Sequence, residues 1–433
     1  MATILFGSAM FNWSETQRMI EIATALYQRG HKIVFIGEGK FDFLLQQHPD
    51  FIRAILPADR EWYTNERVQK MLAMDKYGNN YATSDEIDAV VKQELELIDR
   101  YKPKAIVTGY RMTLSVTARI AKIPIFWVLS AVLSMPYLEP LAKLGKPAPP
   151  KLRTPESIAK FASMVEDHIM TSRMIGSNKT SAAWNQCLAT HCAHLLQCDM
   201  ELFQGDFYLI SDAKEVYSQL SEKKCKFIGP IFNSEKITIE PDQLKILKED
   251  SVKRKIFVSI GSAGTKRYLE IILKAIMGID NCEVFVSVIG ALSEHEQAAY
   301  PKNFHFQDKY PLIQIARYCD VAVTLGGQGT IYAMLYAGCP FVAFPHSFEQ
   351  RNNIINIMRT FSCGEYGLQR NISTDEVYRM VSVVLVDPTY RSNAKRAQSI
   401  IAPYYEDPAM RAENVAAITI EAVIQGKGSI TML

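Results

Sequence analysis

The sequence predicts an α/β protein that consists of two Rossmann-like domains, each a parallel sheet covered by helices. The first observation behind this prediction is length, because 433 residues are too many for one ordinary hydrophobic core. The second is that short apolar segments of strand length alternate with amphipathic helical segments in both halves of the chain. The third is that each half opens on an apolar strand, at residues 2–6 and 255–260, which leads through a loop into a helix.

The N-terminal half begins as a β-α-β unit, in which an apolar strand, an amphipathic helix and a second strand at residues 31–37 follow one another. Later strands are expected at residues 105–108, 124–129, 207–210 and 225–232. The segment 233–254 is polar and has no sustained apolar face, which is typical of a linker. We therefore expect an N-terminal domain at residues 1–232 and a linker at 233–254.

The C-terminal half repeats the alternation and is expected to form a second domain at residues 255–408. Its first strand, 255–260, runs into a glycine-containing loop at 261–265. Further strands are expected at residues 283–289, 304–307, 321–324 and 341–344, and helices at 268–277, 330–336, 354–361, 374–386 and 390–401.

The stretch Asp320–Asn353 carries the strongest functional signal of the chain. Its apolar strand breaks into a loop with three glycines and re-forms as a helix at Thr330. Amide N–H groups and the positive end of a helix converge at such a junction, which predicts an anion site with phosphate as the expected ligand. The pair Glu349 and Gln350 in the next loop could hold hydroxyl groups beside it. A glycine-rich turn alone also fits other Rossmann-like cofactor sites, so the whole ordered set carries the prediction.

The order of these features resembles the donor-binding motif of family 1 (UDP-glycosyltransferase-like) glycosyltransferases of the GT-B class. The matching residues are Gly326, Gly327, Gly329, Thr330, Gly338, Pro340, Pro345, Glu349, Gln350 and Asn352 or Asn353. The resemblance implies two Rossmann-like domains that face each other across a cleft, with a last helix, at about residues 409–433, packing back on the N-terminal domain. Two positions depart from the family. The histidine that precedes the glycines is Leu325 here, and the glutamate that often binds the ribose falls at Ala333, so the chain resembles a divergent member.

The resemblance also implies where the rest of the donor binds. The loop after the strand 255–260 is similar to the family's loop that faces the donor diphosphate, and the segment around residues 306–310 aligns with the one that cradles the nucleotide base. The donor-binding residues expected on this basis are Gly261, Ser262, Phe306, Gln307, Gly326, Gly327, Gln328, Gly329, Thr330, Glu349 and Gln350.

The family's catalytic base is a histidine at the start of the first helix, and its equivalent in this sequence is Glu15. A glutamate can act as a general base when apolar surroundings raise its pKa. The alternative is that Ser14 caps the helix and Glu15 complements the helix dipole. The aspartate that orients the histidine in the family is missing as well, since Gly109, Tyr110 and Arg111 stand at that place.

The acceptor is expected in the N-terminal half, where helical segments between residues 158 and 196 are rich in methionine, a side chain that adapts to varied ligands. The candidate acceptor-binding residues are Trp13, Tyr110, Met135, Met170, Met174 and His346. Ordinary core packing is the alternative for the helical methionines, and a hydrogen-bonded surface position is the alternative for His346. Three cysteines and two histidines between residues 187 and 198 are not spaced as two paired ligand sets, so no metal site is expected.

Composition and charge indicate which classes of binding partner are expected. The formal net charge of +2, with 22% charged residues, gives no basic stripe that could neutralise a nucleic acid backbone, so nucleic acid is not an expected partner. Eight irregularly spaced cysteines, and a start that reads as a buried strand rather than a signal peptide, predict a cytoplasmic protein with free thiols. No run of 18 apolar residues occurs, so no transmembrane segment is expected, while peripheral membrane contact stays open. A monomer or homodimer is expected.

These expectations combine into one hypothesis. The chain moves a hexose from a nucleoside-diphosphate sugar, UDP- or dTDP-linked, to a hydroxyl or amine of a small, largely apolar acceptor such as a natural product. The reaction needs no metal and no cofactor beyond the donor co-substrate, and inversion follows from the family resemblance. The alternatives are a nucleotide-sugar epimerase on the same scaffold, a non-catalytic sugar-nucleotide-binding subunit, and a membrane-docked transferase with a lipid acceptor.

Overall fold

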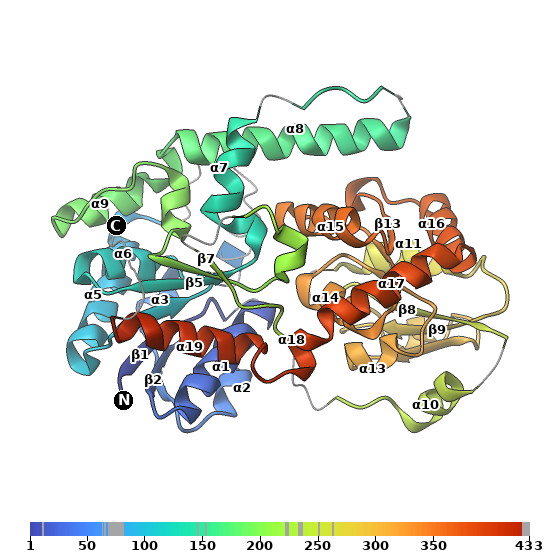
Figure 1. Ribbon diagram of the computed structural model, residues 1–433, viewed down its shortest axis with the longest axis horizontal. Helices are drawn as coiled ribbons and strands as arrows, with labels where there is room; N and C mark the ends of the chain where they lie inside the picture. The colour runs from blue at the N-terminus through green and yellow to red at the C-terminus, as the bar shows by residue number, and fades with distance from the viewer. Residues whose placement is uncertain are drawn as a thin grey trace. The chain divides into compact units, whose positions relative to one another are not determined.

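The computed structural model of the 433-residue chain describes residues 1–10, 13–62, 64, 66–67, 82–144, 147–151, 154–220, 225–232, 237–249, 252–261 and 264–426. These residues form two compact units. Unit 1 contains residues 1–148, 163–231 and 408–433, and unit 2 contains residues 149–162 and 232–407. Each unit has its own parallel sheet with helices packed against it, which confirms the predicted fold class (Figure 1).

Unit 1 is built on a seven-stranded parallel sheet with the order β3-β2-β1-β4-β5-β6-β7. Its strands are β1 (Thr3–Gly7), β2 (Lys32–Ile36), β3 (Ile52–Ala54), β4 (Ala105–Thr108), β5 (Ile125–Leu129), β6 (Phe207–Ile210) and β7 (Cys225–Phe227). Its α-helices are α1 (Trp13–Gln28), α2 (Asp42–Gln46), α3 (Asp59–Trp62), α5 (Ser84–Tyr101), α6 (Thr113–Ala121), α7 (Met135–Lys143), α9 (Ala182–Thr190) and α19 (Ala412–Ile424). Short 3-10 turns occur at Ala131–Leu133, Lys179–Ser181, Asp199–Phe203 and Lys214–Tyr217.

Unit 2 is built on a six-stranded parallel sheet with the order β10-β9-β8-β11-β12-β13. Its strands are β8 (Arg254–Ser259), β9 (Cys282–Ser287), β10 (Phe304–Gln307), β11 (Val321–Thr324), β12 (Phe341–Ala343) and β13 (Gly364–Tyr366). Its helices are α10 (Pro241–Lys248), α11 (Lys266–Ile276), α12 (Glu294–Gln297), α13 (Leu312–Ala316), α14 (Gln328–Ala337), α15 (Phe348–Phe361), the 3-10 turn η5 (Gln369–Asn371), α16 (Thr374–Val386), α17 (Pro388–Ile401) and α18 (Pro403–Glu406). The helix α8 (Pro155–Gly176) begins in unit 2 and continues into unit 1.

The sheet cores explain why the strand predictions from apolar runs succeed. The central strands, such as β1, β4, β5, β9 and β11, are short and consist mostly of buried apolar side chains, as parallel strands buried on both faces must. In unit 1, β1 packs its side chains against α1 and α19, and Figure 1 shows these two helices running alongside each other. Glu421 of α19 contacts the turn between α1 and β2, because it accepts a hydrogen bond from Arg29 Nε at 2.9 Å and lies 2.9 Å from His31 Nε2.

Two parts of the fold differ from what the sequence suggests. Residues 149–162 belong to unit 2, because the guanidinium of Arg370 donates to the carbonyl of Ala159 (3.4 Å) and Lys160 lies over the ring of Tyr366 (4.2 Å). The segment 233–254, expected to be a linker without a sustained apolar face, contains α10, whose Leu247 is buried. The contacts of Arg370 with Ala159 and of Lys160 with Tyr366 each join residues more than 200 positions apart, and a local sequence pattern does not predict such contacts.

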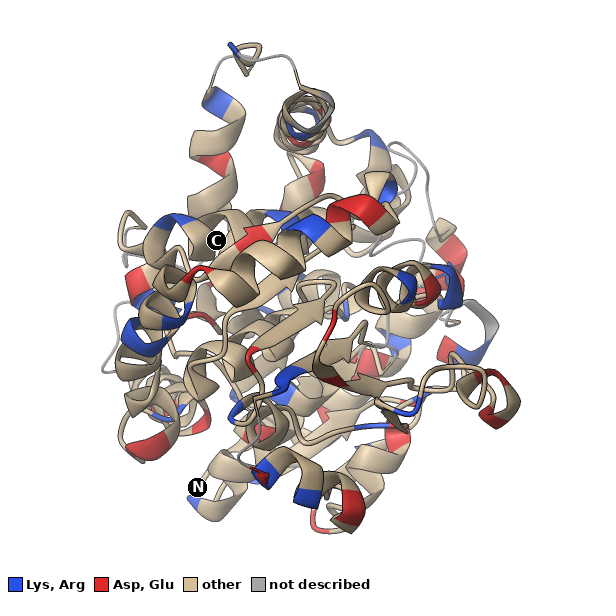
Figure 2. Cartoon of the chain, turned by 90° about the vertical axis from the view of Figure 1, so that its right-hand side faces the viewer, with Lys and Arg blue, Asp and Glu red and all other residues tan. Residues whose placement is uncertain are grey.

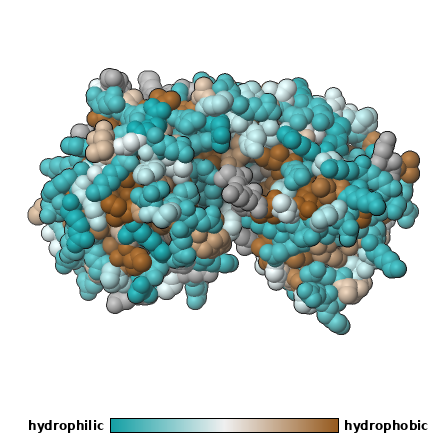
Figure 3. Space-filling model, turned by 90° about the horizontal axis from the view of Figure 1, so that it is seen from below, coloured by the Kyte–Doolittle hydropathy of each residue, from teal (hydrophilic) through white to brown (hydrophobic). Residues whose placement is uncertain are grey.

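The described surface is polar and mixed in charge. In the view of Figure 2, acidic and basic residues are interspersed along the helices. On the face shown in Figure 3, hydrophobic residues form separate patches surrounded by hydrophilic ones. Among the described helices, none has the length and apolar character that crossing a bilayer requires. All eight cysteines are free thiols.

Candidate functional site

The carboxyl ends of three neighbouring strands bring the donor motif of unit 2 together. Strand β11 pairs with β8 on one side and with β12 on the other, all in parallel. The loops that follow the three strands therefore meet at one edge of the sheet, which is where α/β proteins bind ligands. Gly261 follows β8, the glycines at 326–329 follow β11, and Glu349 and Gln350 follow β12. Ser262 lies outside the described residues.

The glycine loop after β11 opens directly into α14. Gly326 has a φ of +82°, a conformation that a side chain would strain, and a Cβ there would lie 3.1 Å from Ile354. The first intrahelical bond of this turn runs from the Ile331 N–H to the Gly327 carbonyl (3.0 Å), and the N–H groups of Gly329 and Thr330 precede it at the helix start. A Cβ added at Gly329 would meet no heavy atom within 4 Å. Open space thus borders the positive end of a helix, which suits an anion.

A second helix begins at the same edge. Ser347 caps α15 by accepting a hydrogen bond from the Gln350 N–H (3.2 Å), and the Gln350 side-chain oxygen accepts from the His346 N–H (3.3 Å). Glu349 is half-buried in the first turn of α15, and His346 is exposed beside it. The two helix starts and this loop place amide donors and a carboxylate close to one another, a combination that can hold phosphate and sugar hydroxyl groups.

Phe306 and Gln307, the residues expected at the nucleotide base, contact other residues of unit 2. The Gln307 side chain donates to the carbonyls of Thr238 (2.7 Å) and Lys309 (2.8 Å) and accepts from the Glu240 N–H (3.3 Å). Phe306 is half-buried and packs against the hydrophobic core of unit 2. Contact with a base stays a prediction for both residues, and the Gln307 amide already has three protein partners.

The two positions that depart from the family motif are both core positions. Leu325 is 2% exposed and belongs to the hydrophobic core of unit 2. Ala333 is 3% exposed within α14. The donor motif has therefore kept its backbone and lost two polar side chains.

In unit 1, polar side chains are buried at the carboxyl ends of adjacent strands. The strands β1, β4, β5 and β6 are neighbours in the sheet, and buried polar groups follow each of them. They are Ser8, Glu15, Arg18, Thr108, Arg111, Ser130, Ser211 and Asp212. Burying a polar group destabilises a protein unless the group is hydrogen-bonded, so we expect these side chains to have hydrogen-bond partners.

Glu15 lies at the centre of this edge and is 0% exposed. Its Oε2 accepts hydrogen bonds from Ser8 Oγ (2.6 Å) and the Ala9 N–H (3.1 Å), and its Oε1 accepts from the Tyr110 N–H (3.3 Å). Burial raises the pKa of Glu15 from 4.5 to about 7, against the opposing effects of the Ser8 hydrogen bond and the Arg18 charge. The carboxylate thus joins the loop after β1 to the loop after β4, and it titrates near neutral pH.

Two further residues at this edge were not singled out by the sequence. Arg18 donates from Nη1 to Ser211 Oγ (2.7 Å), and Asp212 accepts from Ser130 Oγ (3.0 Å) and the Ala131 N–H (2.7 Å). Asp212 comes two residues after the apolar strand β6, whereas Arg18 lies in the second turn of α1. Polar residues at such positions are too frequent in α/β proteins to single these two out without the sheet order.

Arg111 holds the loop after β4, which also carries Tyr110. Its guanidinium makes paired hydrogen bonds to Asp59 (2.8 and 2.9 Å), and its Nε donates to Glu94 (2.8 Å). Thr113 and Thr117 donate to the Glu94 carboxylate as well, at 2.6 and 2.5 Å. All of these side chains are buried, so the network fixes the loop that carries Tyr110.

The predicted acceptor-binding residues occupy scattered positions. Tyr110, Met135 and Met174 are each less than 10% exposed, which favours the core-packing alternative for the methionines. Met170 is half-buried on α8, and Trp13 packs its ring on Phe41 at 5.3 Å. His346 belongs to unit 2 and the other five belong to unit 1. Acceptor contact stays a prediction for all six.

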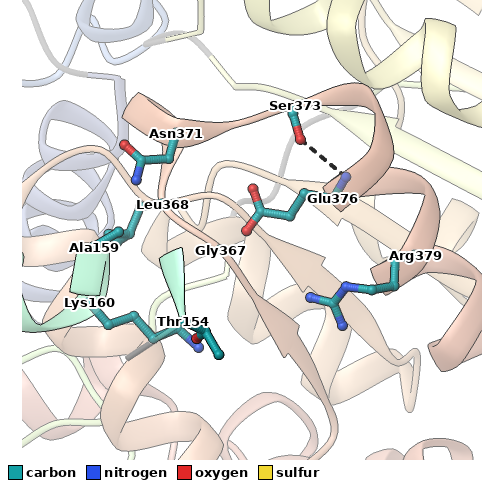
Figure 4. Close-up of a pocket in the computed structure, with 9 residues that line it drawn as sticks. All are labelled: Thr154, Ala159, Lys160, Gly367, Leu368, Asn371, Ser373, Glu376 and Arg379. Atoms are coloured by element: carbon teal, nitrogen blue, oxygen red, sulfur yellow. Dashed lines mark hydrogen bonds between the residues drawn. The ribbon is translucent and has the colours of Figure 1, made fainter. Parts of the chain in front are cut away.

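A cavity of about 360 Å³ lies in unit 2 beyond the end of β13 (Figure 4). It is lined by Thr154, Ala159, Lys160, Gly367, Leu368, Asn371, Ser373, Glu376 and Arg379. Since β13 pairs with β12, the cavity shares the sheet edge of the donor motif, although none of the predicted donor-binding residues is among those that line it. Ser373 caps α16 here by accepting from the Glu376 N–H (3.2 Å), the contact drawn in Figure 4.

Comparisons with known proteins agree with this geometry. Residues 270–415 match the family described as erythromycin biosynthesis protein CIII-like, C-terminal domain. The chain is 23% identical over 427 residues to a PGL/p-HBAD biosynthesis glycosyltransferase of Mycobacterium tuberculosis, with 92% of this chain and 89% of that protein covered. Two solved structures match in fold. The glycotransferase of kitacinnamycin has a TM-score of 0.69 at 14% identity, covering 98% of this chain and 99% of that one. A spinosyn rhamnosyltransferase complexed with thymidine diphosphate has a TM-score of 0.64 at 13% identity, covering 97% and 100%.

Proposed function

We propose that this chain, a divergent glycosyltransferase of the GT-B fold that resembles family 1, moves a hexose from a nucleoside-diphosphate sugar to a small acceptor. The acceptor is a hydroxyl or amine of a largely apolar molecule of the natural product type. The relative and both structural neighbours are named for sugar transfer or for natural products, which supports the acceptor class.

The observation that carries the proposal is the shared edge of β8, β11 and β12. Two helix starts, an open space beside Gly329 and the pair Glu349 and Gln350 meet there. When the bond between the sugar and the β-phosphate oxygen breaks, its electron pair stays on that oxygen, and a diphosphate at the start of α14 gains one negative charge. Amide donors and helix dipoles that are fixed in advance stabilise that added charge. The matched family segment, residues 270–415, contains β11, β12, both helix starts and the pair Glu349 and Gln350, whereas β8 and Gly261 precede it. We propose UDP or dTDP as the nucleotide, and the neighbour complexed with thymidine diphosphate supports a nucleotide of this class.

Glu15 remains the proposed general base, and two observations bear on that role. The pKa of about 7 is suited to a base at neutral pH. The complete burial of the carboxylate and its three hydrogen bonds favour a positioning role for the loops after β1 and β4. The pH dependence of kcat separates the two. A base gives a rate that rises with pH through about 7 and is lost in Glu15→Gln, whereas a positioning residue leaves measurable turnover in that variant.

Donor binding can be tested without knowing the acceptor. UDP and dTDP should raise the Tm of the chain, and Gly329→Val should weaken this binding at least about tenfold, because its side chain fills the space beside the α14 start. Gly176→Val is the matched control, since a Cβ there also meets no heavy atom within 4 Å but the site is far along the chain on α8. Equal binding by both variants would refute the site.

Turnover then distinguishes the alternatives. Incubation of nucleotide sugars with a panel of phenolic and macrolide-like acceptors should give a glycosylated acceptor and free nucleoside diphosphate. An epimerised sugar nucleotide formed without any acceptor would favour the epimerase. The loss of both polar family residues at Leu325 and Ala333 favours a non-catalytic binding subunit as the second candidate, and donor binding without any product would support it.

A further inference from the structure

Three side chains of types that bind metals, Asp88, Cys187 and His191, form a cluster in unit 1. Cys187 and His191 are one helical turn apart at the end of α9, so they point to the same side. Asp88, in the second turn of α5, faces them from across the helix pair, which packs closely. One donor atom from each residue lies within 4.8 Å of the other two.

The distances are close to those of a transition-metal site. His191 Nε2 lies 2.8 Å from Asp88 Oδ1, and Cys187 Sγ lies 3.9 Å from the same oxygen. Zinc binds sulfur at about 2.3 Å and nitrogen or oxygen at about 2.0–2.2 Å, which places tetrahedral ligands about 3.4–3.7 Å apart. Binding would therefore need the His191 and Asp88 side chains to separate by about half an ångström and the cysteine to approach slightly.

The surroundings also fit a bound cation. The side chains of His191 and Asp88 are 20% and 18% exposed, which gives an ion a path from solvent, while Cys187 is fully buried behind them. Lys92 pairs with the second oxygen of Asp88 (2.7 Å) and is 64% exposed, so it can hold that carboxylate from outside or turn away into solvent. One sulfur, one nitrogen and one carboxylate oxygen is a donor set that suits zinc and leaves a fourth position for water.

We propose that Asp88, Cys187 and His191 bind one Zn²⁺ ion that ties α5 to α9. The spacing of the cysteines and histidines between residues 187 and 198 alone predicts no metal site. The third ligand comes from a helix about 100 residues earlier, and only the packing of α5 on α9 brings it into place.

The test is metal binding by the full chain after removal of metal with a chelator. Titration with Zn²⁺ against a coloured chelator should show one tightly bound ion per chain. The variants Asp88→Asn, Cys187→Ser and His191→Gln should each weaken binding at least about tenfold. Cys192→Ser is the matched control, because Cys192 is an exposed thiol next to His191 that is not part of the cluster.

Co²⁺ gives a second readout that reports the ligand itself. Bound Co²⁺ should show a thiolate-to-metal charge-transfer band that is lost in Cys187→Ser and kept in Cys192→Ser. If Cys187→Ser does not fold, Asp88→Asn at its partly exposed position decides by the Zn²⁺ titration alone. No bound ion, or binding that depends on Cys192 and not on Asp88 and Cys187, would overturn the proposal.

Discussion

The buried carboxylate of Glu15 should make the stability of unit 1 depend on pH in a characteristic direction. Its pKa is about 7 in the folded chain and near 4.5 when unfolded. Below pH 4.5 the Glu15 carboxyl is protonated in both states, so its burial does not lower the free energy of unfolding there. As the pH rises from 4.5 to 7, the unfolded chain releases the proton while the folded chain keeps it, so stability falls across this window and stays lower above it.

The size of this effect follows from the two pKa values. Their difference, at about 1.4 kcal/mol per pKa unit, corresponds to about 3 kcal/mol of stability lost between pH 4.5 and pH 8. The change Glu15→Gln removes the titration but keeps the shape. The amide can keep its oxygen toward Ser8 and Ala9, but its NH₂ group then faces the Tyr110 N–H, and that lost hydrogen bond costs about 1–3 kcal/mol at every pH.

The assay can look at unit 1 alone, because all four tryptophans of the chain, Trp13, Trp62, Trp127 and Trp184, belong to it. Urea unfolding followed by tryptophan fluorescence at pH 5, 6, 7 and 8 gives the free energy of unfolding at each pH. The difference between the parent chain and Glu15→Gln isolates this one group from all others that titrate.

The expected result is that the parent loses about 2.5 kcal/mol more than Glu15→Gln between pH 5 and pH 8, because part of the effect is already present at pH 5. Glu21→Gln, on the same helix but partly exposed, serves as the control and should keep the slope of the parent. Parallel pH profiles for the parent and Glu15→Gln would refute the claim that burial holds the carboxyl near neutrality.

Three further predictions concern stability. Gly326→Ala should lower the stability of unit 2 by about 1–2 kcal/mol, because the residue has a φ of +82° and its Cβ would crowd Ile354; circular dichroism melting should report the loss while the tryptophan transition stays. Arg111→Ala should lower the tryptophan-detected stability by about 3–5 kcal/mol, because it leaves two buried carboxylates without their cation, and a loss below about 1 kcal/mol would contradict the network. Glu421→Gln should cost about 1 kcal/mol or less in the same assay, and less in high salt, because its partner Arg29 is 41% exposed.

The strand, glycine loop and helix start after β11 were predictable from sequence because their signal is local. A strand, a glycine loop and a helix start lie within about a dozen residues, and the glycines report backbone geometry directly. The structure places the α14 start at Gln328, two residues before the expected Thr330, and adds the α15 cap at Ser347. The fold class was predictable for a similar reason, since buried parallel strands are recognisable one by one.

The edge of unit 1 was not predictable, because its contacts join distant segments. Arg18 meets Ser211 across 193 residues, and Arg111 meets Asp59 across 52. Residues 149–162 contact the rest of unit 2 where Arg370 donates to the Ala159 carbonyl and where Lys160 lies over the Tyr366 ring. A sequence pattern gives the burial and period of one segment, whereas such pairings depend on sheet order and on which helix faces meet.

Glu15 of α1 lies against Gly109, the residue that follows β4. A Cβ at Gly109 would lie 2.9 Å from Cδ of Glu15 and closer still to Oε1, so the glycine makes room for the acid to reach the Tyr110 N–H. Glu15 is buried, and moving its side chain away from Gly109 would break its hydrogen bonds. Gly109→Ala should therefore lower the stability of unit 1 by about 1–3 kcal/mol. Shortening the acid should relieve the clash, so Gly109→Ala combined with Glu15→Asp should be more stable than the sum of the two single losses predicts. Strictly additive losses in the tryptophan-detected unfolding would show that the acid is not held against Gly109.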